Sequence, residues 1–201
     1  MATKTLNTER GGVLLPIARA TISAALGCVQ QADERAIWLQ EQGACFVTLT
    51  QDGELRGCIG TLEAHRTLLQ DVIANAQAAA FRDPRFPALT AAELDKTQVE
   101  ISLLSAMQPM QFSSERDALA QLQPNVHGVV FEFGSHRSTF LPQVWEQLPN
   151  VVEFMSHLKY NAGLPADFWA EEVRLSSYTV SKWKENDVLE KAESSGERLA
   201  M

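Results

Sequence analysis

The residues with the clearest chemical potential lie in one short segment, Leu55-Arg56-Gly57-Cys58-Ile59-Gly60, which we call the hexad. If this segment is a strand, Arg56 and Cys58 share a face, with their backbones roughly 7 Å apart. A guanidinium beside a thiol favours the thiolate, which is the nucleophilic and metal-binding form. The spacing therefore predicts a site in which Cys58 is a nucleophile or group carrier and Arg56 holds it charged or grips an anion.

The glycines of the hexad are unusual, because glycine weakens a strand. Gly57 and Gly60 are explained by a bulge, by a bound ligand or by close approach of another backbone segment. Cys58 and Arg56 could instead have purely structural roles. Cys58 could be a small buried side chain, and Arg56 could pair with a carboxylate such as Glu100. In the catalytic interpretation Glu100 orients Arg56 or moves a proton, and Ser102 on the same strand face donates a hydrogen bond.

A second group of candidates follows an expected helix over 68–81, in Arg82-Asp83-Pro84-Arg85-Phe86. Arg82 and Arg85 flank a rigid corner and could clamp a carboxylate or phosphate. The alternative is that Arg82 caps the helix end and Asp83 pairs with a neighbouring arginine.

The four histidines show none of the spacings of a metal site, so we expect neither a metal centre nor a cofactor. His127 differs from the others because it is expected at the base of a hairpin, beside Gln143, where it could reach a cleft between strands. Both residues are therefore binding candidates. A structural histidine with satisfied hydrogen bonds is the alternative.

The elements that must position these residues follow from the apolar periodicity. Asp52-Gly53 and Gly134-Ser135 predict two hairpins, and Thr90-Ala91-Ala92-Glu93 predicts a capping box. Hairpins interspersed with helices indicate an α+β fold with an antiparallel or mixed sheet flanked by helices. Helices are expected near 14–26, 35–42, 68–81, 114–122 and 151–162, and strands near 45–50, 54–59, 97–104, 128–133, 137–141 and 173–180.

The composition excludes several classes of protein. The chain has 201 residues, 45% hydrophobic and 21% charged, as in an ordinary globular domain. A formal charge of −8 opposes a general nucleic-acid surface. No apolar run approaches a membrane span, and the N-terminal residues do not form a signal peptide. With three cysteines and no close pair, a disulfide framework is not indicated, so we expect a cytoplasmic protein.

The sequence resembles the AMMECR-type domain family, which includes protein A of the AmmeMemoRadiSam system, over roughly residues 9 to 183. The hexad is the hallmark of that family. One departure lies at His127, where many members carry an acidic residue. The segments that carry the resemblance are Gly43-Ala44-Cys45-Phe46-Val47-Thr48-Leu49, Leu55-Arg56-Gly57-Cys58-Ile59-Gly60, Ala80-Phe81-Arg82-Asp83-Pro84-Arg85-Phe86, Glu100-Ile101-Ser102, Thr139-Phe140-Leu141-Pro142-Gln143-Val144-Trp145 and Ala162-Gly163-Leu164.

The resemblance implies an AMMECR-like fold with a larger and a smaller lobe around a cleft. We expect a single domain over 9–183, a smaller lobe at about 61–108, and a charged, mobile tail over 184–201. It also implies association with a Memo-like protein and a radical S-adenosylmethionine enzyme.

Two functions therefore remain open from the sequence. In the first, the chain is an accessory partner of those proteins, and its hexad, Arg82 and Arg85 form a docking face or a pocket for a small anionic ligand. In the second, it is an enzyme that uses Cys58 on a small anionic substrate.

Overall fold

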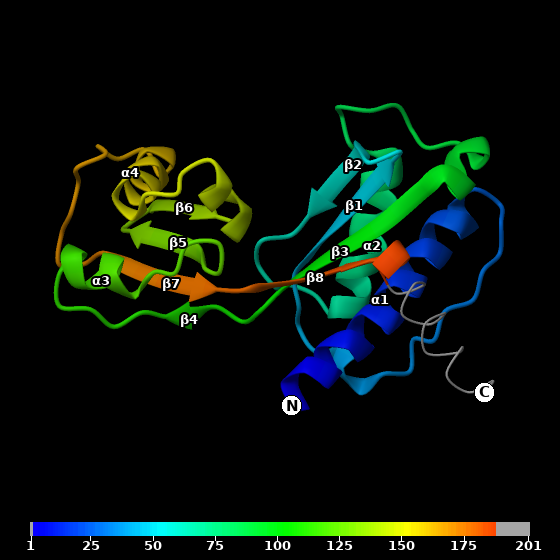
Figure 1. Ribbon diagram of the computed structural model, residues 1–201, viewed down its shortest axis with the longest axis horizontal. Helices are drawn as coiled ribbons and strands as arrows, with labels where there is room; N and C mark the ends of the chain where they lie inside the picture. Colours follow the sequence, from blue (N-terminus) through cyan, green and yellow to red (C-terminus); the bar gives the residue numbers. More distant parts are fainter. Residues whose placement is uncertain (1, 188–201) are drawn as a thin grey trace, which may run out of the picture. The chain divides into compact units, whose positions relative to one another are not determined.

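The computed structural model describes residues 2–187, which form two compact units. The first unit contains residues 2–104 and 181–187, and the second contains 105–180. Each unit has its own four-stranded sheet (Figure 1). The expected smaller lobe at about 61–108 differs from this division, because residues 61–104 supply a helix and a strand to the core of the first unit. Most of the expected tail, 188–201, lies outside the described residues.

The sheet of the first unit has the order β2-β1-β3-β8. Its strands are β1 (Cys45–Gln51), β2 (Glu54–Gly60), β3 (Thr97–Leu104) and β8 (Val180–Lys184). The expected hairpin joins β1 to β2, since Asp52 and Gly53 both adopt positive φ angles, of 51° and 85°. Since β2 is the first strand in this order, it forms one edge of the sheet.

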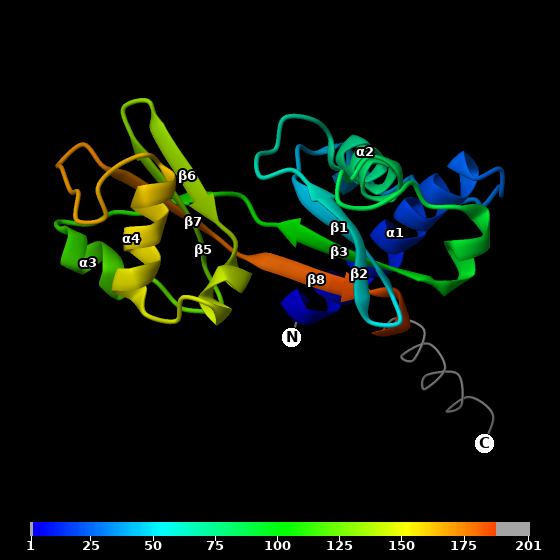
Figure 2. The same cartoon turned by 90° about the horizontal axis from the view of Figure 1, so that it is seen from above.

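Two helices cover one face of this sheet, α1 (Ala2–Ala25) and α2 (Leu68–Phe81) (Figure 2). Alternate residues of β1, namely Cys45, Val47 and Leu49, are fully buried against them. The intervening residues of β1 are only half-buried. This alternation fixes which side chains of the sheet lie on the helical face and which lie on the other.

The second unit has the strand order β4-β7-β5-β6. Its core is centred on Trp145, whose ring stacks on Phe154 at 3.6 Å between centroids. The elements in chain order are β4 (Gln108–Pro109), α3 (Glu115–Gln121), β5 (Gly128–Phe133), β6 (His136–Phe140), η3 (Pro142–Glu146), α4 (Val151–Asn161) and β7 (Arg174–Tyr178).

The structure confirms the α+β class, with antiparallel pairing in both sheets and helices against them. One expected helix is reduced to a single turn, and the expected capping box is present. The segment 35–42 contains only the 3₁₀ turn η1 (Ile37–Gln40), and the capping box at Thr90 opens the 3₁₀ helix η2 (Ala91–Lys96). None of the helices in residues 2–187 combines the length and apolar character that crossing a membrane requires.

Candidate functional site

The two glycines of the hexad are required by packing. A Cβ atom on Gly57 would lie 2.2 Å from the backbone oxygen of Ala79 in α2. A Cβ atom on Gly60 would lie 2.2 Å from the ring of Phe46 in β1. Of the explanations that the sequence left open, the close approach of other protein segments therefore accounts for both glycines.

Cys58 is held in place by the corner that follows α2. Its backbone N–H donates to Asp83 Oδ2 at 2.8 Å, and its carbonyl accepts from Arg85 Nη2 at 3.1 Å. Because β2 is an edge strand, these groups have no neighbouring strand on that side, and an unpaired edge is prone to aggregation. Asp83 and Arg85 thus take the place of a further strand. The half-buried Cys58 thiol also accepts a hydrogen bond from Thr48 Oγ1 at 3.3 Å.

Asp83 and Arg85 form a bidentate ion pair, with Nε–Oδ1 and Nη2–Oδ2 distances of 2.9 and 2.7 Å. The side chain of Asp83 is only 1% exposed, whereas that of Arg85 is 53% exposed. The hydrogen bonds from Arg85 and from the Cys58 N–H hold the pKa of Asp83 well below its usual range. The carboxylate is therefore the buried anchor, and the guanidinium is presented at the surface.

A second pair in the chain, Asp33 and Arg35, has the same sequence separation and the same bidentate contacts. Here, however, the Asp33 side chain is 58% exposed and the Arg35 side chain 90% exposed. Both segments thus contain the motif Asp-x-Arg with the same ion pair. The pair at Asp83 differs because its carboxylate is buried and hydrogen-bonded to strand β2.

Arg56 does not accompany Cys58 as the sequence predicted. The pairing of β1 and β2 shifts register between Leu49 and Thr50, which interrupts the two-residue alternation at Arg56. Arg56 is buried and pairs with Glu93 of η2, with 3.0 Å between Nε and Oε1. This contact, with hydrogen bonds from Thr90, lowers the pKa of Glu93 to about 2.

Arg85, rather than Arg56, contacts Cys58, through a hydrogen bond from Nη2 to the Cys58 carbonyl. The pKa of Arg85 is raised, chiefly by its hydrogen bonds to Asp83 and to a lesser degree by the Cys58 thiol.

Glu100 and Ser102 lie on the same sheet face as Cys58, but across β1. Thr48 is opposite Cys58 on one side and opposite Glu100 on the other, so Cys58 and Glu100 are roughly 10 Å apart at their backbones. The Glu100 carboxylate contacts Lys182 and Lys184 of β8, at 3.1 and 3.4 Å. It does not orient Arg56. Ser102 is opposite Phe46 in the adjoining row.

His127 and Gln143 belong to the second unit. Nδ1 of His127 accepts a hydrogen bond from the Gln123 N–H at 3.2 Å. Its carbonyl accepts another from Trp145 Nε1 at 2.7 Å, which ties the start of β5 to the core. These contacts fit the structural alternative for His127. Gln143 is exposed in η3. Within the described part of the chain, His, Cys, Asp and Glu side chains do not gather in threes at metal-binding distances.

Sequence reasoning missed a buried polar cluster centred on Asp71, which is 0% exposed. Its carboxylate accepts from the Cys45 N–H, Thr61 Oγ1, Arg66 Nε and Asn75 Nδ2, at 2.8, 2.7, 2.8 and 3.0 Å. Burial raises the pKa of the Cys45 thiol well above its usual value, and the negative charge of Asp71 adds to this effect. The only sequence signal was an acidic residue in the first turn of a helix, which is common.

The fold and the hexad together define an α+β protein with two sheets and a corner that covers the edge strand β2. A sequence profile of the AMMECR1 family matches residues 15–183. The chain is 33% identical over 199 residues to Protein MJ0810 of Methanocaldococcus jannaschii, covering 92% of this chain and 97% of that protein. It is 37% identical over 147 residues to a protein of Thermotoga maritima, covering 72% and 79%.

A crystal structure of uncharacterized protein PH0010 from Pyrococcus horikoshii has a similar fold. It superposes with a TM-score of 0.71 at 28% identity, and the match covers 88% of this chain and 92% of that one. The chain belongs to the AMMECR1 family, as the resemblance carried by the hexad predicted.

Proposed function

We propose that this chain is an accessory protein that docks onto a partner through the hexad corner, by which we mean residues 55–60 together with 82–86. The observation that carries the proposal is the asymmetry of one ion pair. Asp83 is buried and fixed to β2, and it holds the half-exposed guanidinium of Arg85 in one orientation at the surface. Arg82, at the end of α2, is exposed beside it in the chain.

Such a corner suits an acidic surface of another protein. Arginine is enriched at interfaces and recognises carboxylates through its planar fork. A guanidinium that is already fixed loses less conformational freedom on binding than a free side chain does. The same geometry would also accept the carboxylate or phosphate of a small anionic ligand. Helix α2 and the Phe46 ring fill the space beside Gly57 and Gly60, which leaves no room there for a ligand. We therefore favour a docking face over a pocket within the hexad.

The partners that fit this proposal are those implied by the resemblance, a Memo-like protein and a radical S-adenosylmethionine enzyme. Three free cysteines are compatible with their cytoplasmic setting. The role is then to hold or present a substrate or protein rather than to transform one.

The test is a binding titration of the full chain against each purified partner. Arg82→Glu is the informative variant, because Arg85 also supports β2 and its loss would disturb the fold. Reversing an exposed charge at an interface should weaken binding by about tenfold, mostly through slower association. Arg35→Glu is the matched control and should bind as the parent does. Equal binding by parent and Arg82→Glu would overturn the proposal.

A second function, catalysis by Cys58, is favoured by one observation. The thiol lies beside the Thr48 hydroxyl and close to Arg85, on a sheet face that also carries Glu100. If this function is correct, Cys58 reacts with iodoacetamide well below pH 8.5, the ordinary thiol pKa. Cys45 is buried and Cys28 is exposed, so the measurement is made in Cys28→Ser and followed by peptide mass spectrometry. A thiol that stays inert at pH 7 in the folded chain rules this function out.

A further inference from the structure

The second unit contains a cavity of about 700 Å³ between helices α3 and α4, which lie side by side (Figure 2). Its lining comes from both helices and from residues 166–167 of the loop that follows α4. The volume is in the range of small-molecule sites in proteins. The cavity is therefore large enough for a ligand, and its lining decides which kind.

A buried lysine lines one end of this cavity. The side chain of Lys159, in the last turn of α4, is only 2% exposed, which is rare for a lysine. Its Nζ donates to Oε1 of Glu115, at the start of α3, at 2.8 Å. An ammonium group has three N–H donors, and within residues 2–187 this is its one hydrogen bond. Two donors of a buried charged group thus lack acceptors, which is costly out of water.

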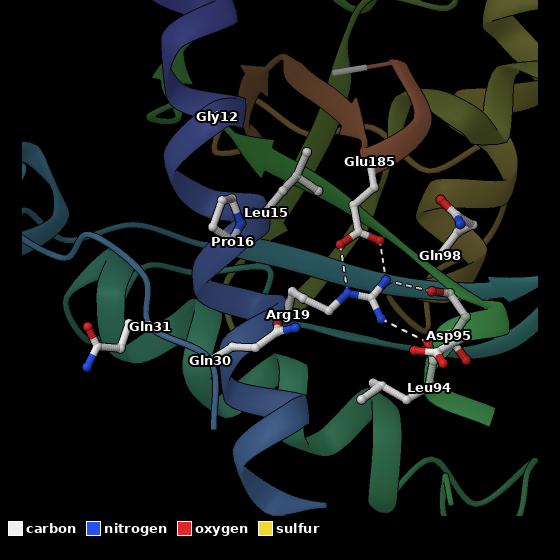
Figure 3. A pocket seen from close by; sticks show the side chains of 11 residues that line it. Gly12, Leu15, Pro16, Arg19, Gln30, Gln31, Leu94, Asp95, Gln98 and Glu185 are labelled. Atoms are coloured by element: carbon white, nitrogen blue, oxygen red, sulfur yellow. Dashed lines mark hydrogen bonds and ion pairs between the residues drawn. The ribbon is translucent and has the colours of Figure 1, made fainter. Parts of the chain in front are cut away.

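The cation at a cavity of the first unit, beside α1, is much better satisfied (Figure 3). Arg19 donates through Nε to Glu185 Oε1 at 2.8 Å, and its Nη2 contacts the second oxygen of that carboxylate. Nη1 and Nη2 also donate to the carbonyls of Leu94 and Thr97, at 3.1 and 2.5 Å. Arg19 thus uses four of its five N–H groups, whereas Lys159 uses one of three.

The charges that line the cavity of the second unit are balanced. Glu115 already supplies the countercharge of Lys159, and it is 34% exposed, so water reaches its carboxylate. Arg116 and Asp167 have opposite signs, and both are exposed to water. The Ser156 hydroxyl can donate or accept and favours neither. The groups that a ligand must satisfy are therefore the buried donors of Lys159, which need an acceptor without a charge.

The rest of the lining is apolar. Val151 and Val152 lie in the first turn of α4, two turns before Lys159 and roughly 10 Å from it along the helix axis. Leu119 and Ala120 line the cavity from α3. Val152 is 60% exposed, although it is a large hydrophobic side chain. The cavity thus offers hydrogen-bond donors at one place and an apolar surface at another.

We propose that this cavity binds a small uncharged molecule that has an amide or ester carbonyl at one end and a short apolar chain at the other. The carbonyl would accept hydrogen bonds from the Lys159 ammonium, and the chain would lie on Leu119 and Val152. The site shares no residue with the hexad corner, so it goes beyond the docking function and can fail or succeed independently of it.

The test uses three probes of similar length and different charge, namely hexanamide, hexanoate and hexylamine, which is protonated at neutral pH. Each is titrated into the isotopically labelled full chain and followed by NMR chemical shifts. We expect hexanamide to bind most tightly and to shift the amides of Val152 and Ser156. The proposal is overturned if hexanamide does not bind, or if either charged probe binds as tightly.

Lys159→Met removes the donors and keeps an unbranched side chain of similar length. Exchanging a buried charge for an apolar group is often tolerated, and Glu115 stays partly in water. The variant should bind hexanamide about tenfold more weakly, as expected when a hydrogen bond from a charged group is lost. Lys96→Met, at an exposed lysine of η2, is the matched control and should bind as the parent does.

Ala120 offers a steric test that leaves the buried ion pair intact, because it is exposed on α3 and lines the cavity. Ala120→Phe should fill part of the cavity and weaken hexanamide by about tenfold or more. His157→Phe, at an exposed position of α4 that does not belong to the lining, should change nothing. Circular dichroism and the unfolding midpoint establish that the variants fold. Unchanged binding in Ala120→Phe, or in folded Lys159→Met, would also overturn the proposal.

Discussion

Gly57→Ala should destabilise the first unit by about 3 kcal/mol, at the upper end of the usual cost of overpacking. The added methyl group would lie 2.2 Å from the carbonyl oxygen of Ala79 and 3.1 Å from its carbon. Both are backbone atoms in the last turn of α2, so no side-chain rotation can relieve the contact. Strand β2 and helix α2 would have to separate, which would also loosen the corner that Asp83 fastens to Cys58. Urea unfolding of the variant and its parent measures the effect.

Gly12→Ala is the matched control, since it adds the same methyl group to a helix with open space around it. Alanine exceeds glycine in helix propensity, so this variant should be more stable than the parent by roughly 0.5–1 kcal/mol. If Gly57→Ala retained the stability of the parent, the contact between α2 and the hexad would be refuted.

Asp71→Asn should cost about 3–5 kcal/mol, the range for breaking a buried charge pair from one side. The carboxylate is fully buried and accepts four hydrogen bonds. An amide of the same shape turns one acceptor into a donor that faces other donors, and it removes the countercharge of Arg66. The start of β1 and the loop after β2 would lose their common attachment to α2. Thermal and urea unfolding of the variant provide the measurement.

The corresponding change at the surface, Asp33→Asn, should leave the unfolding midpoint unchanged. Asp33 also pairs with an arginine, but both side chains are in water, where such pairs contribute little. An equal loss of stability in the two variants would mean that the Asp71 cluster is not buried as described.

Much of the secondary structure could be predicted because its signals are local. The helix over 68–81 and the strand over 97–104 have the predicted bounds, since apolar periodicity and the proline after Asp83 are both read within a few residues. Strands β4 and β8 were not predicted. One has only two residues, and the other depends on pairing with a strand that lies about eighty positions earlier in the chain.

Some contacts at the hexad corner could be predicted from the sequence, whereas others could not. The sequence alternative that Asp83 pairs with a neighbouring arginine is confirmed, because that contact spans two residues. The attachment of the same carboxylate to Cys58 spans 25 residues and has no local signal. The register shift that separates Arg56 from Cys58 is likewise a property of two strands together, so strict alternation within one strand misled the prediction.

In the proposed function the hexad corner docks onto a partner, and the Cys58 sulfur is not required for docking. The most direct measurement compares Cys58→Ser and Arg82→Glu in one titration against the Memo-like and radical S-adenosylmethionine proteins. We expect Cys58→Ser to bind within about twofold of the parent, because a serine can accept the Thr48 hydrogen bond, and Arg82→Glu to bind about tenfold more weakly. Loss of binding in Cys58→Ser with normal binding in Arg82→Glu would contradict the proposed function.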